Sequence, residues 1–323
     1  MATVVVPEFG DPSVMELRDV EPDDPGPGEV RIDVEGIGVN WFDVDNRRGR
    51  YPGQPEPPLI PGCEVSGVIA AVGPGVEEWS TGDEVASFVM YGGYAETVVT
   101  PARWLFPKPE GLDLVEAGGA LITGFTAHNV VHEWGGLNSE ETVLVYAAAG
   151  GVGSMAVQIA SAAGATVIAT ASTEEKLAFA AECGADHLVN YERTDVVEAV
   201  EDVAPGGVDL VLDGVGGDAF QDGLELLEHG GRIVAYGAAS GTVPSVSTPS
   251  LYMRNATLRG YTLNLAMREL PEKVLEARQP LYEGWASGTF DPNVTDVRPL
   301  SDTVAVHEKL ETRKTTGKIV LTP

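Results

Sequence analysis

The 323-residue sequence predicts an α/β protein, in which a Rossmann-type doubly wound parallel sheet accompanies a β-rich domain. Two observations support this fold class. From about residue 121, β-branched segments alternate with helical ones, as in a parallel sheet covered by helices. Before that residue, short alternating segments are separated by Pro and Gly, which is typical of a small barrel-like domain.

The first part of the chain is expected to form antiparallel strands. Alternating or β-branched residues predict strands at 29–39, 65–76, 83–89 and 94–100. A loop rich in Pro and Arg, residues 47–62, separates the first two. This spacing favours a β-rich domain over parallel βαβ units.

The middle of the chain alternates between the two kinds of segment. We expect strands at 142–148, 166–171, 187–191, 208–215 and 232–237, with helices at 154–164, 172–185, 193–204 and 218–231. A sixth strand at 256–263 would form an edge of the sheet. Because an edge strand presents free backbone groups, a homodimer could form there.

The last part, from about residue 265, contains two helical segments, 270–288 and 300–314, and a final strand, 317–323. We expect this part to return to the β-rich domain. The predicted domains are therefore 1–120 with 265–323, and a Rossmann dinucleotide-binding domain at 121–264.

Composition excludes several partners. With 49 acidic and 20 basic residues the net charge is −29, so nucleic acids and anionic membrane surfaces would repel the chain. The uncharged stretch 142–173 is long enough for a membrane span, but its strand–turn–helix–strand pattern contradicts one. The two cysteines, Cys63 and Cys183, suit the cytoplasm. An acidic, Lys-poor composition also predicts a halophilic source, where salt screens self-repulsion.

The strongest motif is the turn AAAGGVG, Ala147–Gly153, which follows one expected strand and opens a helix. In a G-x-G-x-x-G register its first glycine is replaced by Ala148. Such a turn lets the backbone approach a pyrophosphate at a helix N-terminus. The alternative is a structural turn without a ligand. We expect dinucleotide contacts from Ala149, Gly150, Gly151, Val152 and Gly153.

The residues that select NADH or NADPH are expected about 20 residues after the glycine turn, where NAD enzymes carry an acidic residue. Here the second strand ends in Ala171-Ser172-Thr173, which lacks that acid. Ser172 and Thr173 could donate to a 2′-phosphate, with Lys176 and Tyr191 close by, so NADPH is preferred to NADH. Alternatively, Ser172 caps the helix in a capping box with Glu175, and Lys176 is simply solvated.

Other candidate residues follow the remaining strands. Tyr236 and Gly237 end the fifth strand, and Leu263 and Asn264 follow the sixth. In open α/β sheets, ligands bind at this carboxyl edge. Gly214 follows the fourth strand in the segment DGVGG.

Motifs spread over nearly the whole chain resemble the medium-chain dehydrogenase/reductase superfamily, with the order and spacing of its zinc-free quinone oxidoreductase branch. They are GVNWFDVDNRRGRY (38–51), PGCEVSGVIAAVGPGV (61–76), AAAGGVG (147–153), VNY (189–191), DGVGG (213–217), RIVAYG (232–237) and LETRKTTGKIVLTP (310–323). The resemblance implies a GroES-like catalytic domain built from both chain ends, a Rossmann domain, bound NADPH and a homodimer or tetramer.

The resemblance also bears on metal. Zinc-dependent members carry Cys where this chain has Asn40 and His where it has Cys63. Cys63 and Glu64 alone cannot supply the three ligands of a catalytic zinc. His128 and His132 are four residues apart but lack the HExxH pattern. We therefore expect no metal site and no zinc-assisted alcohol chemistry.

Candidate catalytic residues come from the same resemblance. The Asn matching Asn40 lies beside the nicotinamide in the quinone oxidoreductase branch, and the Tyr matching Tyr51 lines the substrate pocket. In related enoyl reductases a Tyr of this loop is considered a proton donor. Thr126 and Lys318 match positions near the cofactor. A second pocket Tyr is replaced by Asn46, next to Asp45, which could favour a smaller or more polar acceptor.

Each assignment has a structural alternative. Tyr51 could anchor the Pro-rich loop, Asn40 could cap the helix that starts near Trp41, and Thr126 could serve as a helix-start hydroxyl. Asp43 is expected to be structural.

The predicted function is a zinc-independent, NADPH-dependent reduction of a small electrophilic substrate, either a quinone or an α,β-unsaturated carbonyl. One alternative is a 2-enoyl thioester reductase, which needs a basic patch for an acyl carrier. Another is a non-catalytic NADPH-binding protein. The arginines that could form the basic patch are Arg47, Arg48, Arg50 and Arg103.

Overall fold

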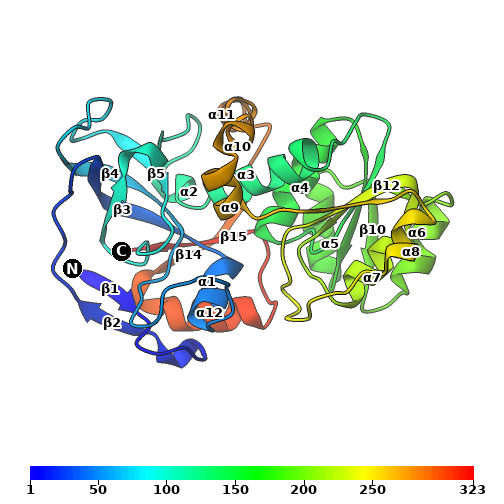
Figure 1. Cartoon of the computed structure of the whole chain (residues 1–323), viewed down its shortest axis with the longest axis horizontal. Coiled ribbons are helices and arrows are strands. Elements are labelled where there is room, and N and C mark those ends of the chain that lie inside the picture. Colours follow the sequence, from blue (N-terminus) through cyan, green and yellow to red (C-terminus); the bar gives the residue numbers. More distant parts are fainter. The chain divides into compact units, whose positions relative to one another are not determined.

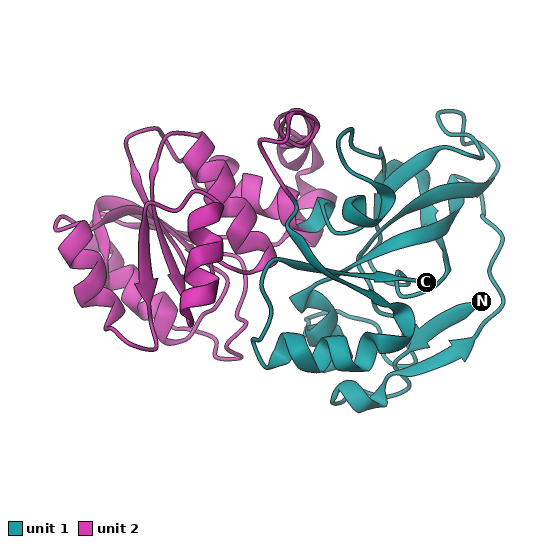
Figure 2. Ribbon diagram, turned by 180° about the vertical axis from the view of Figure 1, so that it is seen from behind, with its two compact units in different colours: residues 1–122, 292–323 teal, residues 123–291 magenta.

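The computed structural model describes residues 1–323, which divide into two compact units (Figure 2). The first unit comprises Met1–Ile122 and Pro292–Pro323, and the second comprises Thr123–Asp291. None of the helices combines the length and the apolar character needed to cross a membrane.

The second unit contains a six-stranded, entirely parallel sheet (Figure 1). Its strand order is β10-β9-β8-β11-β12-β13, which in chain order reads 3-2-1-4-5-6, the Rossmann arrangement. The doubly wound sheet expected from the sequence is therefore confirmed. The strands are β8 (Thr142–Val145), β9 (Thr166–Ala171), β10 (His187–Asn190), β11 (Val208–Asp213), β12 (Leu227–Ala235) and β13 (Thr257–Gly260).

Helices follow most of these strands, and the apolar strands are buried between them. Leu144, Ile168, Val211 and Ile233 are all fully buried, as expected where both faces of a parallel sheet are covered. The helices are α4 (Gly151–Ala162), α5 (Glu174–Glu182), α6 (Val196–Val203), α7 (Asp218–Glu225) and α8 (Thr248–Tyr252). The helix expected over 218–231 ends early, because from Leu227 the chain already pairs with β11 as strand β12.

The second unit extends past residue 264, the boundary expected from the sequence. After β13 the chain forms α9 (Leu263–Glu269), α10 (Pro271–Leu275) and α11 (Arg278–Ser287). Trp285 of α11 packs so closely on α3 (Leu121–His128) that a Cβ at Gly124 would lie 2.7 Å from its ring. Asn129 Nδ2 donates to the carbonyl of Val274 at 3.3 Å. Residues 265–291 therefore pack with the parallel sheet's unit rather than with the first.

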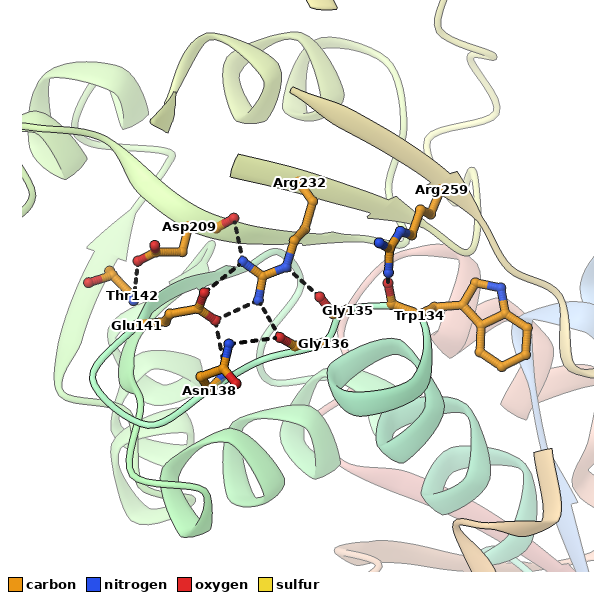
Figure 3. Close-up of polar contacts among 9 residues, drawn as sticks. All are labelled: Trp134, Gly135, Gly136, Asn138, Glu141, Thr142, Asp209, Arg232 and Arg259. Atoms are coloured by element: carbon orange, nitrogen blue, oxygen red, sulfur yellow. Dashed lines mark hydrogen bonds and ion pairs between the residues drawn. The ribbon is translucent and has the colours of Figure 1, made fainter. Parts of the chain in front are cut away.

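Arg232 connects β12 to the loop that precedes β8 (Figure 3). Its guanidinium donates to Glu141 at 3.0 and 2.5 Å, to the Gly136 carbonyl at 2.9 Å, and also to the Gly135 and Asp209 carbonyls. Partial burial acts to raise the pKa of Glu141, but the charge and hydrogen bonds of Arg232 and the hydrogen bonds from Asn138 together outweigh it, so the pKa is lowered. This network fixes residues 135–141 against the sheet.

The first unit is built around a seven-stranded sheet in the order β14-β15-β3-β4-β5-β7, with β6 also pairing with β3. The C-terminal strand β15 pairs antiparallel with β3, with Ile319 opposite Val39. The strands are β3 (Glu29–Val39), β4 (Glu64–Val72), β5 (Glu84–Phe88), β6 (Thr97–Pro101), β7 (Leu105–Pro107), β14 (Val294–Pro299) and β15 (Lys318–Thr322).

Three helices and a two-stranded ribbon complete the first unit. They are α1 (Trp41–Arg47), α2 (Leu114–Ala117), α12 (Thr303–Glu311) and the antiparallel pair β1 (Ala2–Val5) and β2 (Glu16–Asp19). The first seven residues of strand β3 alternate between more and less buried positions, which is why the sequence predicts it well, and its last four residues are all buried.

Candidate active site

The turn between β8 and α4 requires glycine at its last position. The carbonyl oxygen of Ala147 accepts a hydrogen bond from the Gly150 amide at 2.9 Å. A Cβ on Gly153 would lie only 2.2 Å from this oxygen, and one on Gly150 would lie 3.3 Å from it. Ala148 is fully buried and donates its amide to Thr170 of β9 at 3.2 Å, so a methyl group is accommodated there. The replacement of the first glycine by alanine therefore leaves the turn intact.

The residues expected to select the coenzyme lie at the carboxyl ends of β9 and β10. Thr173 is the N-cap of α5, and its Oγ1 accepts the Lys176 amide at 3.3 Å. The capping box expected at Ser172 is therefore wrong, because the helix starts one residue later. The Tyr191 amide donates to Ala171 at 3.2 Å, which brings Tyr191 beside the end of β9.

Glu174 does not leave an isolated negative charge at this edge. Its carboxylate accepts from Asn190 Nδ2 at 2.9 Å and from Arg193 Nη1 at 3.0 Å. Lys176 is half-buried one turn into the helix. The acidic residue that the sequence places here is thus paired with a cation.

Gly214, Tyr236 and Gly237 come together where β11 and β12 end. A Cβ on Gly214 would lie 2.6 Å from the Tyr236 ring, and one on Gly237 would lie 2.8 Å from the Gly214 carbonyl. The adjacent Asp213 carboxyl accepts the Val215 amide at 2.8 Å and the Gly216 amide at 3.0 Å. Burial raises the pKa of Asp213, although these hydrogen bonds oppose the rise.

The remaining candidates of the second unit lie on helices. Leu263 and Asn264 open α9, with Leu263 buried and Asn264 half-buried. Thr126 lies within α3 and is buried. Asn40, Tyr51 and Lys318 belong to the first unit.

Asn40 and Lys318 meet in the first unit, although 278 residues separate them. Lys318 Nζ donates to Asn40 Oδ1 and to Glu64 Oε1, both at 2.6 Å. Asn40 Nδ2 lies 3.0 Å from Glu64 Oε1, 3.2 Å from the Gly38 carbonyl and 3.4 Å from Cys63 Sγ. These contacts fix the orientation of the Asn40 amide.

The ion pair between Lys318 and Glu64 is buried, with side chains 2% and 1% exposed. Small residues make room for it, since a Cβ on Gly38 would lie 2.3 Å from Glu64 Oε1 and one on Gly119 would lie 2.9 Å from Lys318 Cγ. The second Glu64 oxygen accepts the Ile122 amide at 2.9 Å. Sequence reasoning considered Glu64 only as a zinc ligand and missed its pairing with Lys318, because the two residues are far apart in the sequence.

Asp43 holds the backbone of Asn40. Its carboxyl group accepts the Asn40 amide at 2.8 Å, the Gly62 amide at 3.2 Å and the Tyr94 hydroxyl at 3.2 Å. The Asn40 side chain and Asp43 form the capping box of α1, so the helix-cap alternative for Asn40 is confirmed alongside its side-chain contacts. Full burial raises the pKa of Asp43 to about 7.

Tyr51 packs in the loop that follows α1. The Gln54 side chain fixes this loop, since its Oε1 accepts the Tyr51 amide at 2.9 Å and its Nε2 donates to the Asn46 carbonyl at 2.8 Å. The Tyr51 ring is half-buried and lies 4.6 Å, centroid to centroid, from the ring of Phe42. Tyr51 thus keeps a partly exposed face.

The positions that hold zinc ligands in zinc-dependent relatives are occupied by Asn40 and Cys63. Burial, together with the nearby Asp43 and Glu64 carboxyls, raises the pKa of the Cys63 thiol. No group of three His, Cys, Asp or Glu side chains is placed to hold a metal ion. The rings of His128 and His132 lie 4.7 Å apart, centroid to centroid, and are tilted by 54°. Burial lowers the pKa of His128 to about 4.

Two family models match the chain. Residues 26–110 match the alcohol dehydrogenase GroES-like domain, and residues 151–278 match the zinc-binding dehydrogenase model. The chain is 34% identical to 2-haloacrylate reductase of Burkholderia sp over 99% of its own length and 98% of that protein. It is 33% identical to quinone oxidoreductase of Pseudomonas aeruginosa, with 98% and 97% covered. The chain belongs to the medium-chain dehydrogenase/reductase superfamily.

Within this superfamily the chain falls in the zinc-free quinone oxidoreductase branch. Its structure superposes on Escherichia coli quinone oxidoreductase complexed with NADPH with a TM-score of 0.95, at 30% identity and with 100% of both chains covered. The expected combination of a GroES-like domain and a Rossmann-type domain is therefore confirmed for this dehydrogenase/reductase.

Proposed function

We propose that the chain is a zinc-independent, NADPH-dependent oxidoreductase that transfers hydride to a quinone or an α,β-unsaturated carbonyl. The observation that carries the proposal is the hydrogen-bonded cluster of Asn40, Glu64 and Lys318. There, an ammonium group of the chain itself lies against the side chain at a zinc-ligand position. Without a Lewis acid to stabilise an alkoxide, an acceptor that is already electrophilic is favoured over an alcohol.

The second unit fits a dinucleotide. Gly150 is the N-cap of α4 and Gly153 lies in its first turn, so neither position adds a side chain, and the helix N-terminus favours a phosphate there. Ser172, Thr173, Lys176 and Tyr191 would contact the 2′-phosphate. The structure of E. coli quinone oxidoreductase on which the chain superposes is a complex with NADPH. When bound, NADPH supplies the hydride.

The first unit supplies the residues for the acceptor. Tyr51 donates a proton or a hydrogen bond to the oxygen on which negative charge develops. Asn40 is oriented by Lys318, Glu64 and Asp43, and Oδ1 retains capacity to accept another hydrogen bond.

The test is NADPH oxidation in concentrated salt with a quinone, an enone, an enoyl thioester and an aldehyde as separate acceptors. We expect turnover of the quinone, the enone or both. Turnover of the aldehyde alone would contradict the mechanism. NADPH binding without turnover of any acceptor would favour a non-catalytic protein.

Only part of the arginine patch that a 2-enoyl thioester reductase needs remains available. Arg47 is fully buried and is paired with Glu311. Arg48 shares Glu311 at 2.9 Å and lies 3.5 Å from Asp11. Two of the four expected arginines are thus already paired with carboxylates, which disfavours an acyl-carrier partner.

The proposed oligomer is a homodimer formed through β13, or a tetramer assembled from such dimers. β13 is at the edge of its sheet and all four of its residues are exposed. Tyr252 and Met253, just before it, are 63% and 68% exposed. An unpaired edge beside large apolar side chains favours self-association. Light scattering of wild type and of Leu258→Lys tests this, because a monomeric wild type would contradict it.

We propose cytoplasmic residence in a salt-rich cell, on the basis of the net charge of −29. Self-repulsion of so many carboxylates weakens the folded state unless salt screens it. The free energy of unfolding should therefore increase with KCl concentration. Undiminished stability in dilute buffer would contradict the halophilic origin.

A further inference from the structure

Three aromatic rings from separate segments of the first unit form one cluster. Phe42 lies in the first turn of α1, Tyr51 lies in the loop after α1, and Tyr91 lies between β5 and β6. The Phe42 ring meets the Tyr51 ring edge-on at 4.6 Å and lies 6.2 Å from the Tyr91 ring. We call these three residues the aromatic cluster.

Backbone hydrogen bonds fix the segment that carries Tyr91. The Gly92 amide donates to Ile60 at 2.8 Å, and the Tyr94 amide donates to Pro61 at 2.9 Å. The Tyr94 side chain is fully buried and its hydroxyl donates a hydrogen bond to Asp43. Asp43 also caps the N-terminus of α1, the helix that carries Phe42, by accepting the Asn40 amide. The cluster is therefore held in position by the same groups that fix Asn40.

All three rings remain half-buried, so each keeps a face or edge available. Along the chain the cluster is close to Asn40, because Phe42 lies two residues after this N-cap of α1. Burial and the neighbouring Tyr51 and Cys63 raise the pKa of Tyr91, and Cys63 Sγ lies 3.4 Å from Asn40 Nδ2. An apolar, aromatic surface thus lies next to the polar group expected at the reacting centre.

The structure also changes the interpretation of Asn46, at which the sequence suggested a more polar acceptor pocket. The Asn46 side chain is fully buried and neither of its amide atoms is hydrogen-bonded, whereas the backbone carbonyl of Asn46 accepts from Gln54 Nε2. Asn46 therefore cannot present its amide to a ligand. The ring that this position lacks is supplied from elsewhere, by Phe42 and Tyr91.

We propose that Phe42 and Tyr91 are specificity-determining residues that, together with Tyr51, bind the flat face or edge of a ring-containing acceptor and favour it over acyclic enones. This inference rests on the proposed reductase function. Electron-poor rings such as quinones stack well on electron-rich aromatic side chains, whereas a short acyclic enone covers little of such a surface. The selectivity should therefore appear in the binding of the acceptor.

The experiment compares Phe42→Leu, Tyr91→Leu and Tyr91→Phe with wild type. The control is Phe106→Leu, because the Phe106 ring is buried against Phe88 at 5.3 Å, in a separate aromatic pair of the same unit. For 1,4-naphthoquinone and methyl vinyl ketone we would measure kcat and KM separately. We would also measure NADPH affinity, thermal unfolding, and binding of 1,4-naphthalenediol by fluorescence.

We expect Phe42→Leu and Tyr91→Leu to lower kcat/KM for the quinone about tenfold, mainly by raising KM. The kcat/KM for the enone should change by less than about twofold. Tyr91→Phe keeps the ring and should preserve the wild-type ratio between the two acceptors, and Phe106→Leu should lower stability without changing that ratio. Equal losses for both acceptors, or no loss, would overturn the inference.

Failure of the proposed function gives a different result. If wild type reduces neither acceptor, the reductase assignment fails. If Phe42→Leu and Tyr91→Leu each weaken binding of the diol about tenfold, this result would still support recognition of a ring by the cluster. Binding that is unaffected by both substitutions would overturn it.

Discussion

Asp43 and His307 are linked through a single hydroxyl group, that of Tyr94. The Tyr94 oxygen lies 3.2 Å from Asp43 Oδ2 and 3.0 Å from His307 Nε2, and all three side chains are fully buried. Burial raises the pKa of Asp43 to about 7 and lowers that of His307 to about 3. Lys318 and Glu64 also face Asp43, and Arg47 faces His307.

This arrangement predicts opposite pH dependences for the two residues. Between about pH 4 and 6.5 the unfolded chain carries Asp⁻ and His⁺, whereas the folded chain carries both groups neutral. Asp43 takes up a proton on folding and favours low pH; His307 releases one and favours high pH. Their contributions cancel in the wild type.

Single substitutions should reveal the pH dependence that each residue contributes to the unfolding free energy. Relative to wild type, the unfolding free energy of Asp43→Asn should rise with pH in this window, by on the order of 1 kcal/mol per pH unit. That of His307→Gln should fall with pH, and the double variant should show neither slope. Urea unfolding at fixed salt and several pH values measures this. A flat difference for both single variants would contradict the prediction.

Gly153→Ala should weaken both the fold and the dinucleotide site, because the added Cβ would lie 2.2 Å from the Ala147 carbonyl. We expect a loss of about 1–3 kcal/mol in unfolding free energy and weaker NADPH binding. Gly206→Ala is the control, since nothing lies within 4 Å of a Cβ there. Thermal unfolding and NADPH titration of both variants measure these effects. Equal losses of stability and NADPH binding in the two variants would contradict the prediction.

Lys176→Gln should reduce the preference for NADPH over NADH. Loss of the ammonium group would weaken NADPH binding about tenfold if it pairs with the 2′-phosphate, and NADH binding would stay the same. Lys273→Gln serves as the control, because the Lys273 ammonium lies over the Trp134 ring at 4.4 Å. If Lys176→Gln weakens both coenzymes equally, the residue has no role in selectivity.

Tyr51→Phe should lower kcat for an enone by about 100-fold while changing NADPH affinity little, because the hydroxyl is proposed to act on the acceptor oxygen. The phenyl ring preserves the packing on Phe42 at 4.6 Å. Steady-state kinetics and coenzyme titration separate the two effects. An unchanged kcat would remove Tyr51 from the catalytic role.

Arg232→Met should destabilise the second unit without affecting the acceptor residues. The substitution removes the donor to the Gly135 carbonyl and leaves Glu141 and the Gly136 carbonyl with hydrogen bonds from Asn138 only. Arg232 is only 12% exposed. We expect a loss of roughly 3 kcal/mol in unfolding free energy. Arg268→Met is the comparison, since its pair with Glu269 is exposed and should contribute less than about 1 kcal/mol. Similar losses for both would contradict this expectation.

The parallel sheet could be predicted because local patterns specify it: each β-branched strand is followed by a helix, and glycines separate them. The helix prediction was wrong for residues 227–231 (LEHGG) because it too used only local pattern. These residues suit a helix, and only pairing of β12 with β11 makes them a strand. The extent of the second unit was also beyond local pattern, because it depends on Trp285 packing against Gly124, 161 positions earlier in the chain.

The glycine turn could be located because its residues are contiguous. The partners of Asn40 and Asp43 could not, since Glu64, Tyr94, His307 and Lys318 come from separate elements. Tyr91 belongs to no motif, and Phe42 lies in the motif 38–51 without a role assigned to it. Both residues gained their interest only from the cluster that they form with Tyr51. Sequence spacing thus finds sites made from one segment and misses those assembled across the chain.

The pairing of Lys318 with Asn40 and Glu64 also sets an order of events during synthesis. Lys318 leaves the ribosome only after 278 further residues, including the whole of the second unit, have followed Asn40. At about 5–20 residues per second this interval is on the order of tens of seconds. Throughout it, Glu64 has no ammonium partner. The nascent first unit must therefore wait for the second to be made before its centre can close.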